Sequence, residues 1–286
     1  MVKLLSSKEV SSVRFRPPAP EFFSLFDHSF RRRVGVCHGT DFSSPICLNL
    51  ILFEAAEISL PLPRDDRRAQ HLVEVLRRQA GDTFDAGIVN GPRGRGTIAR
   101  VSDRELLLEF SWGSDPPAHH PLTLIVGLPR PQTARAILRE VTSLGVSDIH
   151  FVTTEKGESN YAQSTLWRTG EWRRHLLAGA EQAFCTRIPE VTSGHSLLDA
   201  LSTLPSSGMQ RVALDNYEAT LPVSKLTLTA CTFALAVGPE RGWSAKERNL
   251  LRTNGFELAH IGSRVLRTET ACIAAVSLIK AKIGSM

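Results

Sequence analysis

The last fifty residues contain two glycine-rich turns, each of which joins an apolar run to a segment with helical spacing. The first turn, residues 238–243, reads Gly-Pro-Glu-Arg-Gly-Trp and follows the apolar run 233–237. The second, residues 262–270, reads Gly-Ser-Arg-Val-Leu-Arg-Thr-Glu-Thr and follows the run 258–261. Strands that alternate with helices predict an α/β domain with a largely parallel sheet. Because ligands of such sheets bind where the strands end, the two turns predict a ligand cleft.

Several residues of the turns fit this prediction. Ser244 and Glu247 have the spacing of a capping box, which predicts that a helix starts at Ser244. Glycine at positions 238, 242 and 262 lets the backbone approach a bulky ligand without a Cβ in between. Taken alone, each turn is better explained as an ordinary strand-to-helix connection with charged residues facing water. The combination of the two turns favours a binding site.

The alternation of strands and helices continues upstream of the turns. Apolar runs at 122–128, 146–152 and 211–215 predict further strands. A helix expected between the first two runs ends at Gly145, and its apolar face consists of Ala134, Ile137, Leu138 and Val141. Another helix is expected from about residue 170 into the segment 181–187. These elements place the cleft in a domain of several parallel strands.

Residues 49–117 have a different pattern, with short strands around one helix. Asp65 or Asp66 is expected to cap that helix, and Gly81 is expected to end it. Its predicted apolar face consists of Leu72, Val75 and Leu76. The pattern predicts a small β-barrel.

Two strands of this barrel are predicted by the runs 97–101 and 105–110, with a glycine-arginine turn at 91–96 before them. That turn lacks the Lys-Ser/Thr ending of a phosphate-binding loop and precedes a strand, so we do not expect it to bind a nucleotide. The proline-rich segment 115–121 is a domain boundary, and its two adjacent histidines are expected to belong to a linker.

The net charge of +5 is concentrated at the start of the chain. Residues 1–47 hold seven Lys and Arg against four Asp and Glu, lack sustained periodicity, and are expected to form a disordered extension. Phosphate contacts elsewhere must therefore come from local patches. The five cysteines form no CxxC pair or metal-binding spacing, and no run approaches the roughly 20 apolar residues of a membrane span. A cytoplasmic protein without metal or membrane is expected.

The combination Gly-Pro-Glu-x-Gly-x-Ser-x-x-Glu followed by Gly-x-Arg-Val-Leu-Arg-Thr-Glu-Thr-Ala closely resembles one family. This family consists of the RsmE-type enzymes. They are S-adenosyl-L-methionine (SAM)-dependent methyltransferases of the SPOUT class, and they methylate N3 of a uridine in 16S ribosomal RNA. The similarity covers nearly all of residues 48–286. It implies a PUA-like β-barrel that binds RNA at 48–117 and a SPOUT methyltransferase domain at 118–286. It also implies a trefoil knot over about 232–275 and a homodimer that acts on 16S rRNA or the small ribosomal subunit.

The resemblance also implies roles for single residues. The cofactor would contact Leu214, Gly238, Pro239, Glu240, Gly242, Ile261, Gly262, Val265, Leu266, Arg267 and Thr270. In catalysis, Arg267 would steady the negative charge on the uracil or its phosphate, and Glu269 would accept the N3 proton, directly or through water. A structural ion pair between Arg267 and Glu269 is the alternative.

RNA contacts are expected from basic residues of both domains. Four basic residues, His71, Arg77, Arg93 and Arg95, could contact an RNA backbone, although a solvated surface is the better explanation of each one taken singly. Arg187 matches a basic segment of the family. Two aromatic residues, Tyr161 and Trp167, could stack on unpaired bases or could pack in the core.

The chain departs from the family pattern at three positions. Arg241 replaces a glycine, Ser143 replaces a glutamate, and Cys185 stands where an arginine is common. The Arg241 side chain is expected to point outward. Two other functions stay open: a non-catalytic RNA-binding or ribosome-associated homologue with a decayed cleft, and a SPOUT methyltransferase with another target nucleotide.

Overall fold

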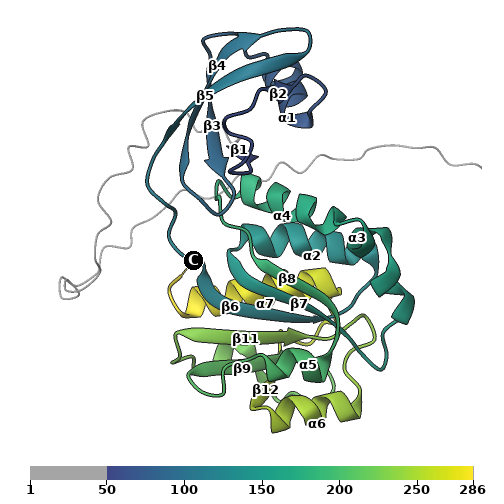
Figure 1. The fold of residues 1–286 in the computed structure, drawn as a ribbon. Coiled ribbons are helices and arrows are strands. Elements are labelled where there is room, and N and C mark those ends of the chain that lie inside the picture. Colours follow the sequence, from purple (N-terminus) through teal and green to yellow (C-terminus); the bar gives the residue numbers. More distant parts are fainter. Residues whose placement is uncertain (1–49, 286) are drawn as a thin grey trace, which may run out of the picture. The chain divides into compact units, whose positions relative to one another are not determined.

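A computed structural model describes residues 50–285, so the disordered extension expected at 1–47 lies outside the described residues. The described residues belong to one compact unit and form two sheets (Figure 1). The first sheet has the strand order β1-β3-β4-β5-β2, with β1 parallel to β3 and the other pairs antiparallel. Its strands are β1 Leu50–Phe53, β2 Leu62–Pro63, β3 Thr83–Ile88, β4 Arg93–Val101 and β5 Glu105–Trp112.

The helix expected beside this sheet is shorter and less regular than predicted. Asp66 caps α1, Arg67–Gln70, which continues into a π-helical segment, η1, His71–Val75. The helix ends at Val75, so the end predicted at Gly81 was wrong. The Val75 side chain is also exposed, because a π-helical turn holds an extra residue and rotates the following side chains around the helix axis.

The turn predicted at 91–96 was too long, because β4 already begins at Arg93. Gly94 therefore lies inside a strand, where a Cβ would lie 2.0 Å from the carbonyl oxygen of Ser111 on β5. This glycine permits the close approach of two strands and does not bend the chain.

The second sheet has seven strands, and every neighbouring pair in it is parallel. Their order is β10-β12-β9-β11-β6-β7-β8. The predicted α/β domain with a parallel sheet is therefore confirmed. The strands are β6 His120–Gly127, β7 Val146–Thr153, β8 Glu190–Ser196, β9 Met209–Leu214, β10 Leu221–Pro222, β11 Thr232–Val237 and β12 Phe256–His260.

Helices cover both faces of this sheet (Figure 1). Leu124 of β6 packs in a core with α2, α4 and α7, whereas its neighbour Ile125 packs in a second core with α5 and α6. Adjacent strand residues point to opposite faces, which accounts for the two cores. The helices are α2 Pro131–Ser143, η2 Ser159–Gln163, α3 Thr165–Arg168, α4 Glu171–Gln182, α5 Leu197–Ser202, η3 Val223–Lys225, α6 Ala245–Thr253 and α7 Thr268–Lys282.

Most elements of this domain agree with the sequence patterns. The four residues assigned to the apolar face of α2 are all buried, and Gly145 follows the helix with a φ of +73°. The missed elements include β8 and α5. The sequence of β8, Glu-Val-Thr-Ser-Gly-His-Ser, has no apolar run, because this strand lies at the edge of the sheet. Within residues 50–285, no helix has the length and apolar character that crossing a bilayer requires.

Candidate functional site

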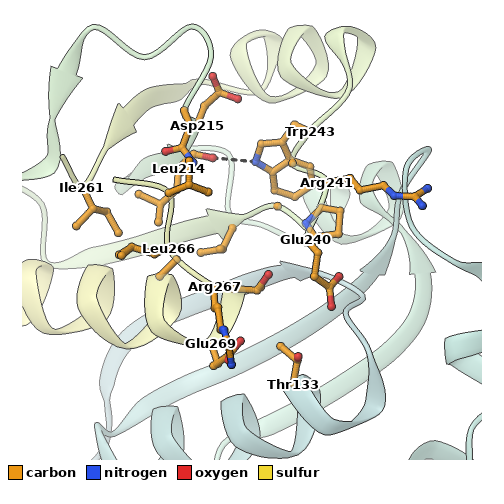
Figure 2. A pocket seen from close by; sticks show the side chains of 18 of the residues that line it. Thr133, Leu214, Asp215, Glu240, Arg241, Trp243, Ile261, Leu266, Arg267 and Glu269 are labelled. Carbon is orange, nitrogen blue, oxygen red and sulfur yellow. Dashed lines mark hydrogen bonds between the residues drawn. The ribbon is translucent and has the colours of Figure 1, made fainter. Parts of the chain in front are cut away.

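A cavity of about 720 Å³ lies where β9, β11 and β12 end, which is the edge that the two turns predicted (Figure 2). This volume is in the range of small-molecule sites, about 300–1,000 Å³. The cavity brings together four connections, which follow β6, β9, β11 and β12. Its lining consists of Arg130, Thr133, Leu214–Tyr217, Val237–Trp243, Ile261, Arg264–Glu269 and Ala271.

The first turn forms one wall of the cavity and is held by its neighbours. Gly242 has a φ of +66°, which favours glycine. The buried Trp243 donates its indole N–H to the carbonyl oxygen of Leu214 at 3.1 Å, which ties the turn to the end of β9. On the other side, the Glu240 carboxylate accepts the backbone N–H of Arg130 at 3.0 Å. The wall is therefore anchored at both ends.

The helix after this turn begins as predicted. Ser244 and Glu247 form the capping box, with the Ser244 N–H donating to the Glu247 carboxylate at 2.7 Å. The other carboxylate oxygen of Glu247 accepts the backbone N–H of Glu155 at 2.8 Å. Glu247 thus fixes both the start of α6 and the segment after β7.

Arg241 does not block the cavity. Its side chain is 72% exposed and runs away from the cavity, with its guanidinium 3.8 Å from the Glu158 carboxylate (Figure 2). The positive φ of this turn belongs to Gly242, so the arginine takes an ordinary backbone conformation. The outward orientation expected from the sequence is confirmed.

The second turn forms the opposite wall. Gly262 has a φ of +125°, and its N–H donates to Nδ1 of His260 at 3.0 Å. The turn is shorter than predicted, because α7 already begins at Thr268 and Arg267 occupies its N-cap position. Val265 is 81% exposed and lies at the mouth of the cavity.

Arg267 and Glu269 both line the cavity, near Thr133 of α2 (Figure 2). The ion pairs of residues 50–285 include neither of them, so the alternative of a structural pair between them is not found. Glu269 sits in the first turn of α7, where the helix dipole favours a negative charge. Both side chains are available to a ligand.

Most residues expected to contact a cofactor share this cavity. Gly262 instead lines an adjoining cavity of about 330 Å³, and Thr270 is exposed on α7 and lines neither. Residues in the main cavity are Leu214, Gly238, Pro239, Glu240, Gly242, Ile261, Val265, Leu266 and Arg267.

Sequence reasoning missed the contributions of two other connections. Arg130 and Thr133 follow β6, and Asp215 to Tyr217 follow β9. Both segments lie at the carboxyl ends of predicted strands, which is the signal that could have found them.

The basic residues expected to bind RNA lie elsewhere, and some are engaged within the protein. Arg93 donates to the Phe184 carbonyl oxygen at 3.1 Å and lies over its ring, 4.6 Å from the centroid. Arg187 donates to two carbonyl oxygens of the linker, at 3.0 Å and 2.8 Å. His71 lies in η1, Arg77 follows it with a φ of +54°, and Arg95 lies 3.5 Å from the Thr83 hydroxyl.

The two aromatic residues proposed for base stacking are partly buried. The Trp167 ring packs against Phe151, with centroids 4.9 Å apart, and Tyr161 packs against the same core. Their side chains therefore serve core packing, the alternative that the sequence left open.

The sequence and structure match known proteins over most of the chain. A family model described as an RNA methyltransferase domain matches residues 116–280. The ribosomal RNA small subunit methyltransferase E of Treponema pallidum is 36% identical over 82% of this chain and 91% of its own length. A second one, from Borreliella burgdorferi, is 30% identical over 84% of this chain and 100% of its own length. The chain belongs to the ribosomal RNA small subunit methyltransferase E family.

Solved structures support the fold of this methyltransferase E homologue. A methyltransferase E from Neisseria gonorrhoeae, bound to S-adenosyl methionine, superposes with a TM-score of 0.69 at 22% identity, covering 82% of this chain and 97% of its own. A methyltransferase from Legionella pneumophila, in complex with SAM, has a TM-score of 0.67 at 22% identity, covering 81% and 96%. Within residues 50–285, no group of three or more His, Cys, Asp or Glu side chains could hold a metal.

Proposed function

We propose that this methyltransferase E homologue uses SAM to methylate N3 of a uridine in 16S ribosomal RNA. The observation that carries the proposal is the meeting of both turns, Arg267 and Glu269 in one cavity at the carboxyl edge of a parallel sheet. The family name supports ribosomal RNA of the small subunit as the substrate. The N3 position comes from the sequence resemblance.

The cavity fits a bent, partly apolar cofactor. Leu214, Ile261 and Leu266 supply apolar surface, and the backbone of the first turn supplies polar groups. A Cβ at Gly238 would lie 3.1 Å from the Cα of Gly242, so the two glycines keep this turn tight and leave its inner side open. When bound, SAM supplies a methyl group activated by a sulfonium.

The side chains beside this space suit the chemistry of a uracil. N3 carries a proton, so a nucleophilic N3 requires loss of that proton and stabilisation of the charge that develops on O2 or O4. Glu269 would accept the proton, directly or through water, and Arg267 would hold the negative charge. Arg130 lies at the same cavity and adds a second positive charge.

The wider organisation follows from the same resemblance. We expect residues 48–117 to act as a PUA-like RNA-binding barrel and 118–286 as the SPOUT domain, with a trefoil knot over about 232–275. The exposed apolar side chain of Val265 at the cavity mouth supports a homodimer in which the partner completes the site. The enzyme would act in the cytoplasm, where ribosomal subunits mature.

Tritium transfer from labelled SAM tests this function. The substrates are 16S rRNA and small subunits from a strain that lacks this modification, and we expect N3-methyluridine by mass spectrometry after nuclease digestion. No SAM binding by calorimetry would support a non-catalytic RNA-binding protein. A methyl group on another nucleotide would support a SPOUT enzyme with a different target.

A further inference from the structure

The loop that follows β9, residues 215–219, carries an exposed aromatic side chain. Tyr217 is the one exposed aromatic residue in the segment 50–285, with 72% of its surface accessible, and it lines the mouth of the 720 Å³ cavity. A large aromatic side chain exposed beside a cavity is typical of a binding surface.

The loop that carries Tyr217 is firmly held. The Asp215 carboxylate accepts the backbone N–H groups of Tyr217 and Glu218 at 2.9 Å and 2.6 Å. Arg248 of α6 lies 3.6 Å from the Asp215 carboxylate and 2.7 Å from that of Glu218, and Arg252 also pairs with Glu218. Because the loop is already ordered, it loses little conformational entropy when a ligand binds to Tyr217.

The ring itself is positioned by two cations. Nζ of Lys156 lies 5.6 Å from its centroid, and the Arg248 guanidinium lies 5.5 Å from it. Both cations also donate to the carbonyl oxygen of Trp243, at 3.0 Å and 2.8 Å. The phenol ring is thus fixed against the first turn, where a Cβ on Gly242 would lie 3.4 Å from it.

The charges around the ring suit a polyanion. Lys156 and Arg264 take part in none of the ion pairs found in residues 50–285, and Arg264 lines the same cavity. A flat aromatic surface beside unneutralised cations is the combination that binds single-stranded nucleic acid, because bases stack and phosphates pair with the cations.

We propose that Tyr217 is a stacking platform for an unpaired base of the substrate RNA, next to the nucleotide that enters the cavity. Lys156 and Arg264 would contact the adjacent phosphates. This role rests on the proposed function, and it replaces the stacking role considered for Tyr161 and Trp167, which pack in the core.

Fluorescence anisotropy of labelled single-stranded 8-mers tests the platform with the full-length protein. The probes are octauridylate, octaadenylate and a ribose-phosphate 8-mer without bases. We expect Tyr217→Leu, which keeps an apolar side chain, to weaken binding of the two base-containing probes about 5- to 150-fold. The same variant should bind the abasic probe like the parent protein, and Tyr217→Phe should bind all three probes like the parent protein.

Several results would overturn the inference. An equal loss on the abasic probe would show that stacking is not involved, and no loss on any probe would show that Tyr217 does not contact RNA. A weaker affinity for SAM by calorimetry, with unchanged RNA binding, would place the ring over the cofactor. A change of oligomeric mass would place it between subunits. Failure of the parent protein to methylate 16S rRNA would contradict the proposed function while leaving the base dependence measurable.

Discussion

At the scale of single residues, the cavity depends on backbone conformations and charges that few side chains can supply. Gly242 adopts a φ of +66° next to the Tyr217 ring, and Arg267 is a cation outside every ion pair found in residues 50–285. The departure at Arg241 leaves both features intact, because its side chain points outward. Substitutions of Gly242 and of Arg267 are therefore expected to have different effects.

Gly242→Ala should destabilise the protein and weaken SAM binding, because a Cβ at positive φ costs about 1–2 kcal/mol and this turn forms the cavity wall. Gly255→Ala is the matched control, since Gly255 has a φ of +78° after α6 and a Cβ there would meet no atom within 4 Å. Both variants should unfold at similarly lowered temperatures in calorimetric scans. Only Gly242→Ala should raise the Kd for SAM, and an equal change in Gly255→Ala would contradict the assignment.

Arg267→Ala should lower kcat for methyl transfer about 100- to 1,000-fold, the usual loss when a group that stabilises developing charge is removed. The Kd for SAM should change little, because the backbone at this position remains. Arg267→Lys keeps the charge and should recover part of kcat. Single-turnover assays with small subunits measure the rate of methyl transfer. An unchanged rate in Arg267→Ala would exclude a role for Arg267 in stabilising the charge on the uracil.

At the scale of elements, the junction between the first sheet and the α/β domain contains Arg187, an expected RNA contact, and Glu181. Arg187, before β8, donates to carbonyl oxygens of the linker, and Glu181, in the last turn of α4, accepts the backbone N–H of Leu52 on β1 at 3.3 Å. Both contacts join segments that are distant in the sequence, so both are expected to affect stability.

Arg187→Gln should lower the free energy of unfolding by about 1–2 kcal/mol, because a charged donor is lost from linker carbonyls. If the linker contact is its main role, RNA affinity at a temperature well below unfolding should stay within about twofold of the parent. Urea titration and anisotropy measure the two effects. A large loss of RNA affinity without a loss of stability would restore Arg187 as an RNA contact.

Glu181→Gln should raise the unfolding temperature at neutral pH. Burial raises the pKa of the Glu181 carboxyl, so the folded state binds its proton more readily than the unfolded state does. The stabilising contribution of the protonated acid is present below the unfolded pKa and is lost as pH rises through the folded pKa. Glutamine keeps an oxygen acceptor for Leu52. Thermal scans should show a difference that shrinks as the pH falls toward 4, and a pH-independent difference would contradict this account.

At the scale of the whole molecule, the cavity is open on the side of the second turn, where Val265 is 81% exposed. Leu266 of the same turn and Leu221 of β10 are also exposed. Apolar side chains beside a proposed active site suit a subunit contact, in agreement with the homodimer implied by the resemblance.

Sedimentation equilibrium should therefore give twice the chain mass of 31.4 kDa. Val265→Glu should shift the protein toward monomers and lower methyl transfer, because a charge would be buried in the contact. Leu198→Glu is the control, since Leu198 is 57% exposed on α5, away from the cavity lining. A monomeric parent protein, or an unchanged mass in Val265→Glu, would contradict the dimer.

Local patterns were enough to predict much of this protein. The alternation of strands and helices, the two turns and the Ser244–Glu247 capping box each depend on residues close together in the chain, and all are found in the structure. Most of the residues that the resemblance assigns to the cofactor lie in the two turns and line one cavity. The errors included element ends, the short helix α5 and the edge strand β8, where apolar spacing carries no signal.

The remaining walls of the cavity depend on which strands are neighbours. β11 pairs with β6 on one side and with β9 on the other, and this order brings Arg130, Thr133 and Tyr217 to the two turns. Hydrophobic periodicity shows that a strand is buried but not which strand lies beside it, because every buried parallel strand has a similar apolar pattern. The local sequence therefore predicts the two turns of the site, whereas the order of the strands decides which other residues line it.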